Sequence, residues 1–271
     1  MSTANATGPV LWSLDARGVA SVVLNRPDVN NAYDEALIQG LLAALDALGR
    51  ATDLRAVVIT GTGRHFQAGA DLNWLDAVRR SSPQENVRVS RATAEAVRRL
   101  NAAPVPTVAL VQGGCFGGGT GLVAACDVAI AADNAMFSIA EVRWGLTAAI
   151  IVPQLADAIG ARQLRRYALT GERFDAAEAR RIGLVHAVVP LAELTAAGER
   201  MVGHLLENAP QAIAETKALA LACAIGHPDE ATFAALVESH AAKRQSAEAA
   251  EGLASFREKR AARWGAGPAT P

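Results

Sequence analysis

The sequence predicts an α/β protein built around a mostly parallel sheet. Up to about residue 175, segments rich in Val, Ile and Leu alternate with segments whose apolar residues repeat at helical spacing. Two of the strand-like segments, LRAVVIT and PTVALV, are short apolar runs of the kind found in buried strands. Because strands separated by helices usually pair in parallel, this order favours one sheet covered by helices.

The first expected elements are two strands, over residues 10–14 and 18–24, joined by a tight turn at Arg17-Gly18. Asp34 suits the N-cap of a helix that runs to about Gly49, because Leu and Ile recur there at helical spacing. The next elements are expected over residues 54–60 (strand), 83–101 (polar helix), 106–111 (strand) and 119–126 (a helix of small residues).

From about Asp175 the chain becomes Ala-rich and helical, with one short strand expected near residues 184–188. We expect residues 1–200 to form the core and residues 201–271 to form a C-terminal helical region.

The charge balance excludes a general electrostatic attraction to nucleic acid or to an anionic membrane. The 271-residue chain has 26 basic and 27 acidic residues, for a net charge of −1. Cys115, Cys126 and Cys223 are far apart and lack C-x-x-C spacing, which argues against disulfides and structural zinc and favours a reducing cytoplasm. No segment approaches the ~18 uninterrupted apolar residues of a membrane span, and no targeting segment is evident.

Two segments that contain glycine each follow an expected buried strand. They are HFQAGADL over residues 65–72 and GGCFGGGTG over residues 113–121. Chain without bulky side chains at a strand end can present backbone N–H groups to an oxyanion, and the second segment also opens a helix. Taken alone, the glycines of the second segment fit close helix packing equally well.

These segments also resemble the two signatures of the enoyl-CoA hydratase/isomerase family, also called the crotonase family. FQAGADL resembles the first, and GGCFGGGTGLVAACDVAIA resembles the second. Agreement extends over roughly residues 10 to 264. The resemblance implies a crotonase-like spiral of ββα units and a C-terminal helical region that forms homotrimers or dimers of trimers.

The resemblance also implies a catalytic site. It assigns an oxyanion hole to the backbone N–H groups of Ala70 and Gly118, and general acid/base chemistry to Glu141. Two preorganised donors can stabilise the negative charge on a thioester enolate by roughly 3 kcal/mol each. Without the family context, Glu141 near Arg143 would be read as a solvated ion pair.

One position departs from the usual hydratase pattern. The family's hydratases commonly have a second glutamate two residues after GGG, where this chain has Gly121. A single glutamate suits a Δ3,Δ2-enoyl-CoA isomerase, which only moves a proton, or a hydratase whose water is held by another group. The runs GGGTGLVAACDVAIA and FSIAEVRWGL resemble the branch that hydrates methylglutaconyl-CoA and isohexenylglutaconyl-CoA in leucine and terpene catabolism, which also has this glycine.

We therefore expect a hydro-lyase that acts on a branched glutaconyl-CoA. Arg143 is a candidate to bind the extra carboxylate of such a substrate, although a structural salt bridge is the alternative. Trp144 and Trp74 are candidates to line a long acyl pocket, although packing in the core explains either equally well.

Coenzyme A enters as part of the substrate, and no separate cofactor or metal is expected. The resemblance places Val29, Ala68, Asp71 and Leu72 along the pantetheine and adenine, and Lys259 near the phosphates. A solvated surface role is the alternative for Lys259, because it lies in the charged run REKRAAR.

The sequence is also compatible in part with two other classes of protein. Gly119-x-Gly121-x-x-Ala124 formally matches a relaxed dinucleotide fingerprint, but Asp133 comes too early for the ribose acid of a dehydrogenase. A non-catalytic member of the fold that binds acyl-CoA or RNA is the other class, because fold alone does not fix function. The glycines and Glu141 argue against that class.

Overall fold

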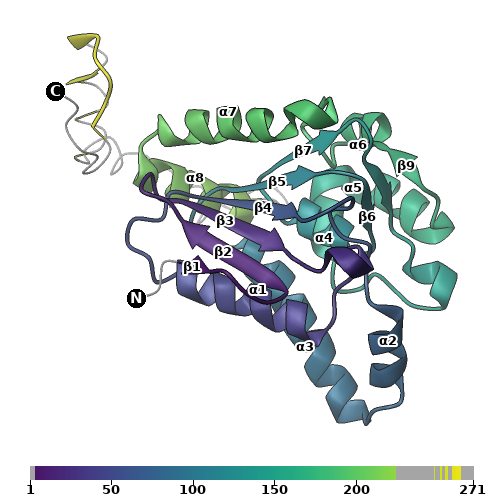
Figure 1. The fold of residues 1–271 in the computed structure, drawn as a ribbon. Helices are drawn as coiled ribbons and strands as arrows, with labels where there is room; N and C mark the ends of the chain where they lie inside the picture. The colour runs from purple at the N-terminus through teal and green to yellow at the C-terminus, as the bar shows by residue number, and fades with distance from the viewer. Residues whose placement is uncertain (1–3, 224–246, 248–250, 252–253, 256–257, 264–271) are drawn as a thin grey trace, which may run out of the picture.

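The computed structural model describes residues 4–223, 247, 251, 254–255 and 258–263. Within this part of the chain, a seven-stranded sheet has the order β1-β2-β3-β4-β5-β7-β10, and β6, β8 and β9 form a second sheet (Figure 1). The strands of the large sheet are β1 (Ala4–Asn5), β2 (Val10–Leu14), β3 (Val19–Leu24), β4 (Ala56–Gly61), β5 (Thr107–Val111), β7 (Val128–Ala132) and β10 (Ala187–Val189). Those of the small sheet are β6 (Gly114–Phe116), β8 (Met136–Ser138) and β9 (Phe174–Asp175).

The large sheet is parallel from β3 to β10, which confirms the predicted α/β class. The expected N-terminal hairpin is also present, with Leu14 opposite Ala20 in the antiparallel pair β2–β3. Its turn needs glycine, because Gly18 has φ +79° and a Cβ there would lie 2.1 Å from the carbonyl oxygen of Asp53.

Strand side chains alternate between two apolar layers. On β5, Ala109 and Val111 join the larger core cluster, while Val108 and Leu110 join the cluster on the opposite face. Helices α1 (Glu35–Leu48) and α3 (Pro83–Asn101) pack together, and α1 contributes to the larger cluster, whereas α7 (Leu194–Leu206) covers the opposite face (Figure 1). Because both faces of these strands are covered, their sequences are apolar at nearly every position instead of alternating between apolar and polar residues.

Helix α1 begins as the sequence predicts. The Asp34 carboxylate accepts a hydrogen bond from the Leu37 N–H at 2.9 Å, which satisfies one of the unpaired donors of the first turn. The predicted polar helix matches α3, and Ser82 caps it. Sequence analysis did not predict α2 (Leu72–Arg79), a short helix with no buried residue.

The other helical segments lie around the small sheet and after β10. They are η1 (Pro27–Val29), α4 (Gly118–Ala124), η2 (Glu141–Trp144), α5 (Val152–Thr170), α6 (Ala176–Ile182), η3 (Leu191–Glu193) and α8 (Pro210–Cys223). The division into residues 1–200 and 201–271 stays a prediction, and its boundary falls inside α7. In the part of the chain that is described, no helix combines the length and apolar character of a membrane span.

A buried ion pair fixes α8 to the sheet. The Lys217 ammonium lies 2.7 Å from the Asp127 carboxylate and donates to the Val105 carbonyl at 3.0 Å, and its side chain is 8% exposed. Asp127 also accepts hydrogen bonds from the backbone N–H and the hydroxyl of Thr107. The pair therefore joins α8 to the starts of β5 and β7.

We predict that Lys217→Met lowers the free energy of unfolding by roughly 3 kcal/mol, because it leaves a partly buried carboxylate without its cation. Urea denaturation monitored by circular dichroism measures this change. The matched control is Arg98→Met, which removes an exposed i,i+3 pair with Glu95 and should cost less than about 1 kcal/mol. Equal costs for the two variants would show that the Lys217 pair has no special role.

Candidate active site

The two glycine-containing segments run side by side after leaving the same edge of the sheet. One follows β4 and the other follows β5, and Gln67 pairs with Cys115 in a parallel bridge. The Phe116 N–H donates to the Gln67 carbonyl at 2.9 Å. In this register, Ala70 and Gly118 each lie three residues beyond a bridged residue, so they occupy equivalent places on adjacent segments.

In the described part of the chain, the backbone N–H groups of Ala70 and Gly118 make no hydrogen bond. Tyr33 pairs with the chain on both sides of Ala70, donating to the Gly69 carbonyl at 2.8 Å and accepting from the Asp71 N–H at 2.9 Å. The Ala70 N–H takes no part in this bridge. The Gly118 N–H likewise has no hydrogen-bond acceptor among the described residues. Both donors therefore remain available to an external oxygen, as the oxyanion assignment requires.

Side chains press closely against the second donor, which explains why glycine occupies residues 117 and 118. Gly117 has φ +51°, and a Cβ there would lie 2.8 Å from the Glu141 Oε1. A Cβ on Gly118 would lie 2.6 Å from the Tyr33 Cε1. The absence of side chains at these positions thus lets Glu141 and Tyr33 approach the backbone that carries the oxyanion donor.

Glu141 is held beside this backbone by the preceding strand. The Gly117 N–H donates to the Ser138 carbonyl at 2.8 Å, and Ser138 ends β8, three residues before Glu141 opens η2. The Glu141 Oε2 is buried and has no hydrogen-bond partner among the described residues. Burial of the carboxyl raises the pKa of Glu141 above its ordinary value, because the charged form loses hydration.

The ion-pair reading of Glu141 is wrong. No ion pair joins Glu141 to Arg143 in the described part of the chain. The Arg143 Nε instead donates to the Gly171 carbonyl at 2.9 Å, which fixes the side chain to the end of α5. A partly buried carboxyl that has one unpartnered oxygen and a raised pKa, next to the Gly118 N–H, is suited to proton transfer.

Helix α4 has no room for a second carboxylate at residue 121. A Cβ on Gly121 would lie only 2.2 Å from the Ile151 Cγ2, and Ile151 is 1% exposed. Sequence analysis identified the missing glutamate but not Ile151, which lies just before α5 and fills the space beside Gly121.

Four of the five residues expected to bind coenzyme A lie on two paired loops. The Ala68 N–H donates to the Asn30 carbonyl at 3.0 Å, which joins the loop of Val29 to the loop that leads into α2. Val29 is 40% exposed and Leu72 is 59% exposed, so both are accessible to a ligand. The structure therefore brings Val29, Ala68, Asp71 and Leu72 together next to the Ala70 donor.

The Asp71 side chain has a structural role that was not predicted from the sequence. Its carboxylate caps α2 by accepting from the Asn73 N–H at 3.0 Å and the Trp74 N–H at 3.3 Å. It also lies 3.3 Å from the Arg26 guanidinium. The signal was present in the sequence, because an aspartate directly before a helical segment is a common N-cap.

Lys259 is not brought to these loops. It belongs to the described fragment 258–263, which lies at the end of the molecule away from α2 and α4 (Figure 1). Its side chain is exposed. Contact between Lys259 and the coenzyme A phosphates stays a prediction.

The two tryptophans differ in their surroundings. Trp144 is 64% exposed, so the core-packing alternative is wrong for this residue. Trp74 packs against the larger core cluster and makes an edge-on contact with Tyr33, with ring centroids 5.7 Å apart. Sequence analysis did not single out Tyr33, whose ring lies between Trp74 and Gly118.

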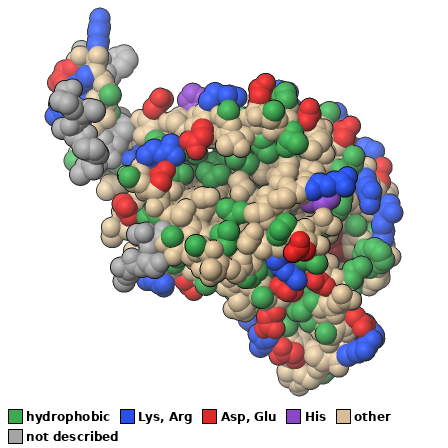
Figure 2. Space-filling view, viewed as in Figure 1, with side chains coloured by type: hydrophobic (Ala, Val, Ile, Leu, Met, Phe, Trp, Pro, Cys, Tyr) green, Lys and Arg blue, Asp and Glu red, His purple; other side chains and the backbone are tan. Residues whose placement is uncertain are grey.

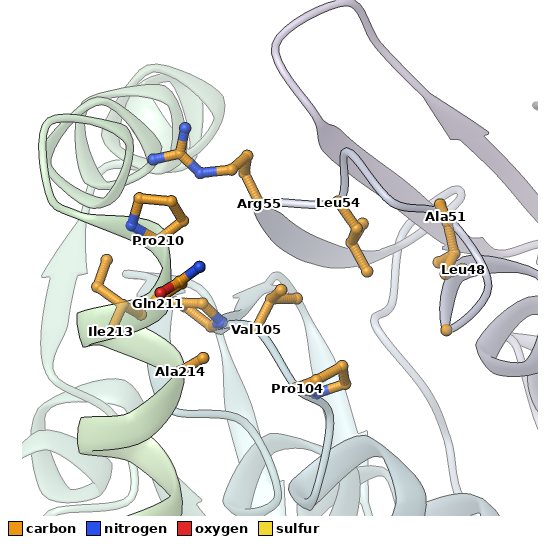
Figure 3. Close-up of a pocket in the computed structure, with 12 residues that line it drawn as sticks. Leu48, Ala51, Leu54, Arg55, Pro104, Val105, Pro210, Gln211, Ile213 and Ala214 are labelled. Atoms are coloured by element: carbon orange, nitrogen blue, oxygen red, sulfur yellow. The ribbon is translucent and has the colours of Figure 1, made fainter. Parts of the chain in front are cut away.

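An apolar cavity of ≈ 250 Å³ lies at the opposite edge of the sheet (Figure 3). Leu54 and Arg55 line it just before β4, Val105 lines it just before β5, and Pro210 and Ile213 of α8 close it. The oxyanion donors instead follow the carboxyl ends of the same two strands. This cavity is therefore separate from the candidate active site.

Charged side chains of both signs lie on the face of the molecule that Figure 2 shows. Figure 2 shows basic and acidic side chains intermixed over the visible face. This distribution agrees with the net charge of −1 for the whole chain.

The fold places the Ala70 and Gly118 N–H groups and the Glu141 carboxyl on neighbouring segments of the chain. The family described as Enoyl-CoA hydratase/isomerase matches residues 15–267. A crystal structure of an enoyl-CoA hydratase from Shewanella pealeana superimposes with a TM-score of 0.90 at 37% identity, covering 94% of this chain and 96% of that one. The predicted crotonase-like fold is thus confirmed.

Curated relatives agree with this match. A putative enoyl-CoA hydratase from Thermus thermophilus is 36% identical over 91% of this chain and 97% of its own length. A hydroxycinnamoyl-CoA hydratase-lyase from Pseudomonas fluorescens is 35% identical over 74% of each chain. The chain therefore belongs to the enoyl-CoA hydratase/isomerase family.

We predict that activity declines on the acid side at a higher pH than an ordinary glutamate would cause. Glu141 must be ionised to accept a proton, and a raised pKa means that the ionised fraction falls sooner as pH decreases. The measurement is the pH profile of kcat/KM, with circular dichroism at each pH to exclude unfolding. An acid limb within the ordinary glutamate range would contradict this role of the raised pKa.

Proposed function

We propose that the protein is a hydro-lyase that adds water across the conjugated double bond of an enoyl-CoA thioester. The observation that carries the proposal is the position of Glu141, whose Oε2 is buried without a partner and whose Oε1 lies against Gly117, next to the free Gly118 N–H. A carboxyl in this position can exchange a proton with a ligand whose thioester oxygen binds the two donors.

The chemistry follows from this arrangement. The Ala70 and Gly118 N–H groups would bind the thioester oxygen and stabilise the negative charge that develops when water attacks C3. Glu141 would accept a proton from the water and return it to C2 of the enolate. The free N–H donors act in the transition state more than in the ground state, because charge develops on the oxygen only during reaction.

For the substrate, we propose a branched glutaconyl-CoA such as isohexenylglutaconyl-CoA or 3-methylglutaconyl-CoA. The resemblance to that branch supports it, and so does Arg143. The Arg143 Nε is bonded to Gly171, while no carboxylate lies within ion-pair distance of its guanidinium among the described residues. Its terminal nitrogens are thus available to bind a second carboxylate. The exposed Trp144 and Leu146 offer apolar surface for a long acyl branch.

A Δ3,Δ2-enoyl-CoA isomerase is the second candidate function. The observation that favours it is the packing of Ile151 against Gly121, which excludes the second carboxylate of the common hydratases. An isomerase needs one group to move a proton, and Glu141 suffices for that. A non-catalytic acyl-CoA or RNA-binding role is disfavoured because the site keeps a buried carboxyl oxygen of Glu141 without a partner, at a cost in stability.

We also propose that the protein acts in the cytoplasm as a homotrimer or a dimer of trimers. The family resemblance supports the assembly, and the scattered cysteines support a reducing compartment. Most of the C-terminal region expected to form the trimer lies outside the described residues.

The proposed function is tested by assaying the purified protein on crotonyl-CoA, the two branched glutaconyl-CoA esters and a 3-enoyl-CoA. We predict loss of the conjugated enoyl absorbance on a glutaconyl ester. Glu141→Gln should lower kcat by about 10³-fold with little change in substrate affinity, because it removes acid/base catalysis and preserves shape. New conjugated absorbance from the 3-enoyl ester, without any hydration, would instead establish the isomerase.

We predict that Arg143→Gln raises KM for a glutaconyl ester by roughly 10-fold or more, because a charge-assisted pair with the substrate carboxylate is lost. KM for crotonyl-CoA, which lacks that carboxylate, should change less than about 2-fold by the same argument. Steady-state kinetics on both esters provide the comparison. A parallel rise for both substrates would indicate that Arg143 only supports the loop through Gly171.

A further inference from the structure

Tyr33 lies at the junction of the three functional groups of the site. Its backbone forms the parallel bridge with Ala70, and its ring occupies the space that a side chain on Gly118 would need. Its ring also packs edge-on against Trp74, at an interplanar angle of 69°. The side chain is therefore held in one orientation between the two oxyanion donors.

The Tyr33 hydroxyl has no assigned partner. No described residue forms a hydrogen bond with it, although the ring is largely buried. Three side-chain oxygens of the described residues are fully buried without a partner, in Gln67, Glu141 and Gln154, and the Tyr33 hydroxyl is not among them. The hydroxyl therefore remains open to a molecule in the site.

The hydroxyl remains neutral at ordinary pH. Burial raises the pKa of Tyr33 to about 12, and the negative charge of Glu141 contributes to this rise. Tyr33 is thus unsuited to act as a base, but it can donate and accept hydrogen bonds. The effect of Glu141 on Tyr33 also indicates that the two groups face a common region.

Hydration by Glu141 alone lacks a second group to orient the attacking water. The attacking water needs two contacts to be oriented, and Glu141 supplies only one of them. The usual second glutamate is excluded by Ile151, which fills the space beside Gly121. A polar group from another part of the chain must therefore hold the water if the proposed hydration takes place.

We propose that the Tyr33 hydroxyl is this second group and holds the attacking water beside C3. The proposal rests on the proposed hydratase function. The water donates one hydrogen bond to the Glu141 carboxylate and the other to the Tyr33 hydroxyl oxygen.

In the proposed step, the water oxygen forms a bond to C3 as the C2–C3 π bond breaks. That electron pair forms a π bond between C1 and C2, and the π pair of the carbonyl moves to the thioester oxygen, which gives the enolate. Glu141 takes one proton from the water and then delivers it to C2, which restores the thioester carbonyl. The second hydrogen of the water stays on the new C3 hydroxyl group, which still donates a hydrogen bond to the Tyr33 oxygen. The proton of the Tyr33 hydroxyl does not move.

The test is Tyr33→Phe, which removes the hydroxyl and preserves the ring that packs on Gly118 and Trp74. We expect kcat for hydration to fall by roughly 10- to 100-fold, as for loss of one positioning contact, while KM changes less than about 2-fold because the ring contacts remain. The second readout is exchange of the C2 protons of butyryl-CoA with deuterated water, followed by NMR. This exchange needs Glu141 and the oxyanion donors but no attacking water, so it should persist in the variant.

Tyr167→Phe is the matched control, because Tyr33 and Tyr167 are the two tyrosines of the chain. The Tyr167 hydroxyl donates to Glu178, away from the site. This variant should hydrate at the rate of the unaltered protein. If hydration and exchange fall together in Tyr33→Phe, or if neither falls, the proposal is overturned. If the unaltered protein exchanges C2 protons but hydrates none of the esters, the proposed function itself fails.

A third measurement does not depend on a variant. In protein labelled with 3-fluorotyrosine, two ¹⁹F resonances are expected, one for each tyrosine. Binding of butyryl-CoA should shift the Tyr33 resonance and leave the Tyr167 resonance in place. An unshifted Tyr33 resonance at saturation would show that the hydroxyl does not face the bound thioester.

Discussion

The unpaired backbone N–H groups of Ala70 and Gly118 are the constraint on which the rest of the site depends. An N–H group without an acceptor in the protein forgoes the stabilisation of a hydrogen bond, and it stays in place to bind an oxyanion only where the surrounding chain is fixed. Here the fixing elements are two parallel strands, β4 and β5, that end at the same edge of the sheet. The bridge between Gln67 and Cys115 sets the register, and the bridge between Tyr33 and Ala70 holds the first donor from the other side.

Close packing around the second donor determines the acid/base group. Glycine at residues 117 and 118 admits the Glu141 carboxyl and the Tyr33 ring to positions that any Cβ would block. The same closeness removes water from Glu141 and raises its pKa, so the geometry that places the carboxyl also tunes it. Ile151 beside Gly121 then leaves no room for a second carboxylate at residue 121. The glycines at residues 117, 118 and 121 thus determine which side chains can approach the site.

How far the sequence predicted the structure depends on the range of the interactions. The hairpin and the helix capped by Asp34 were predictable, because turn chemistry, capping and periodicity act over a few residues. The short helix after Asp71 was missed, because its eight residues carry only a brief apolar pattern and none of them is fully buried.

Residues of the site were likewise predictable only where local sequence encodes them. The free N–H groups at Ala70 and Gly118 agree with motifs that are contiguous in the sequence, whereas the contacts of Tyr33 and Ile151 join residues far apart in the chain. No local pattern encodes such contacts, and only the folded sheet reveals them. The assignment of Lys259 rested on resemblance alone, and the fold does not bring that residue to the other four.

The most direct test of the account is the carbonyl stretching frequency of a bound thioester. Isotope-edited infrared spectroscopy would use [1-¹³C]crotonyl-CoA bound to the Glu141→Gln variant, which should bind the ester with little turnover. If Ala70 and Gly118 both donate to the thioester oxygen, the carbonyl is polarised and its frequency falls well below that of the free ester in water. A frequency equal to that of the free ester at saturation would contradict the oxyanion site and the mechanism built on it.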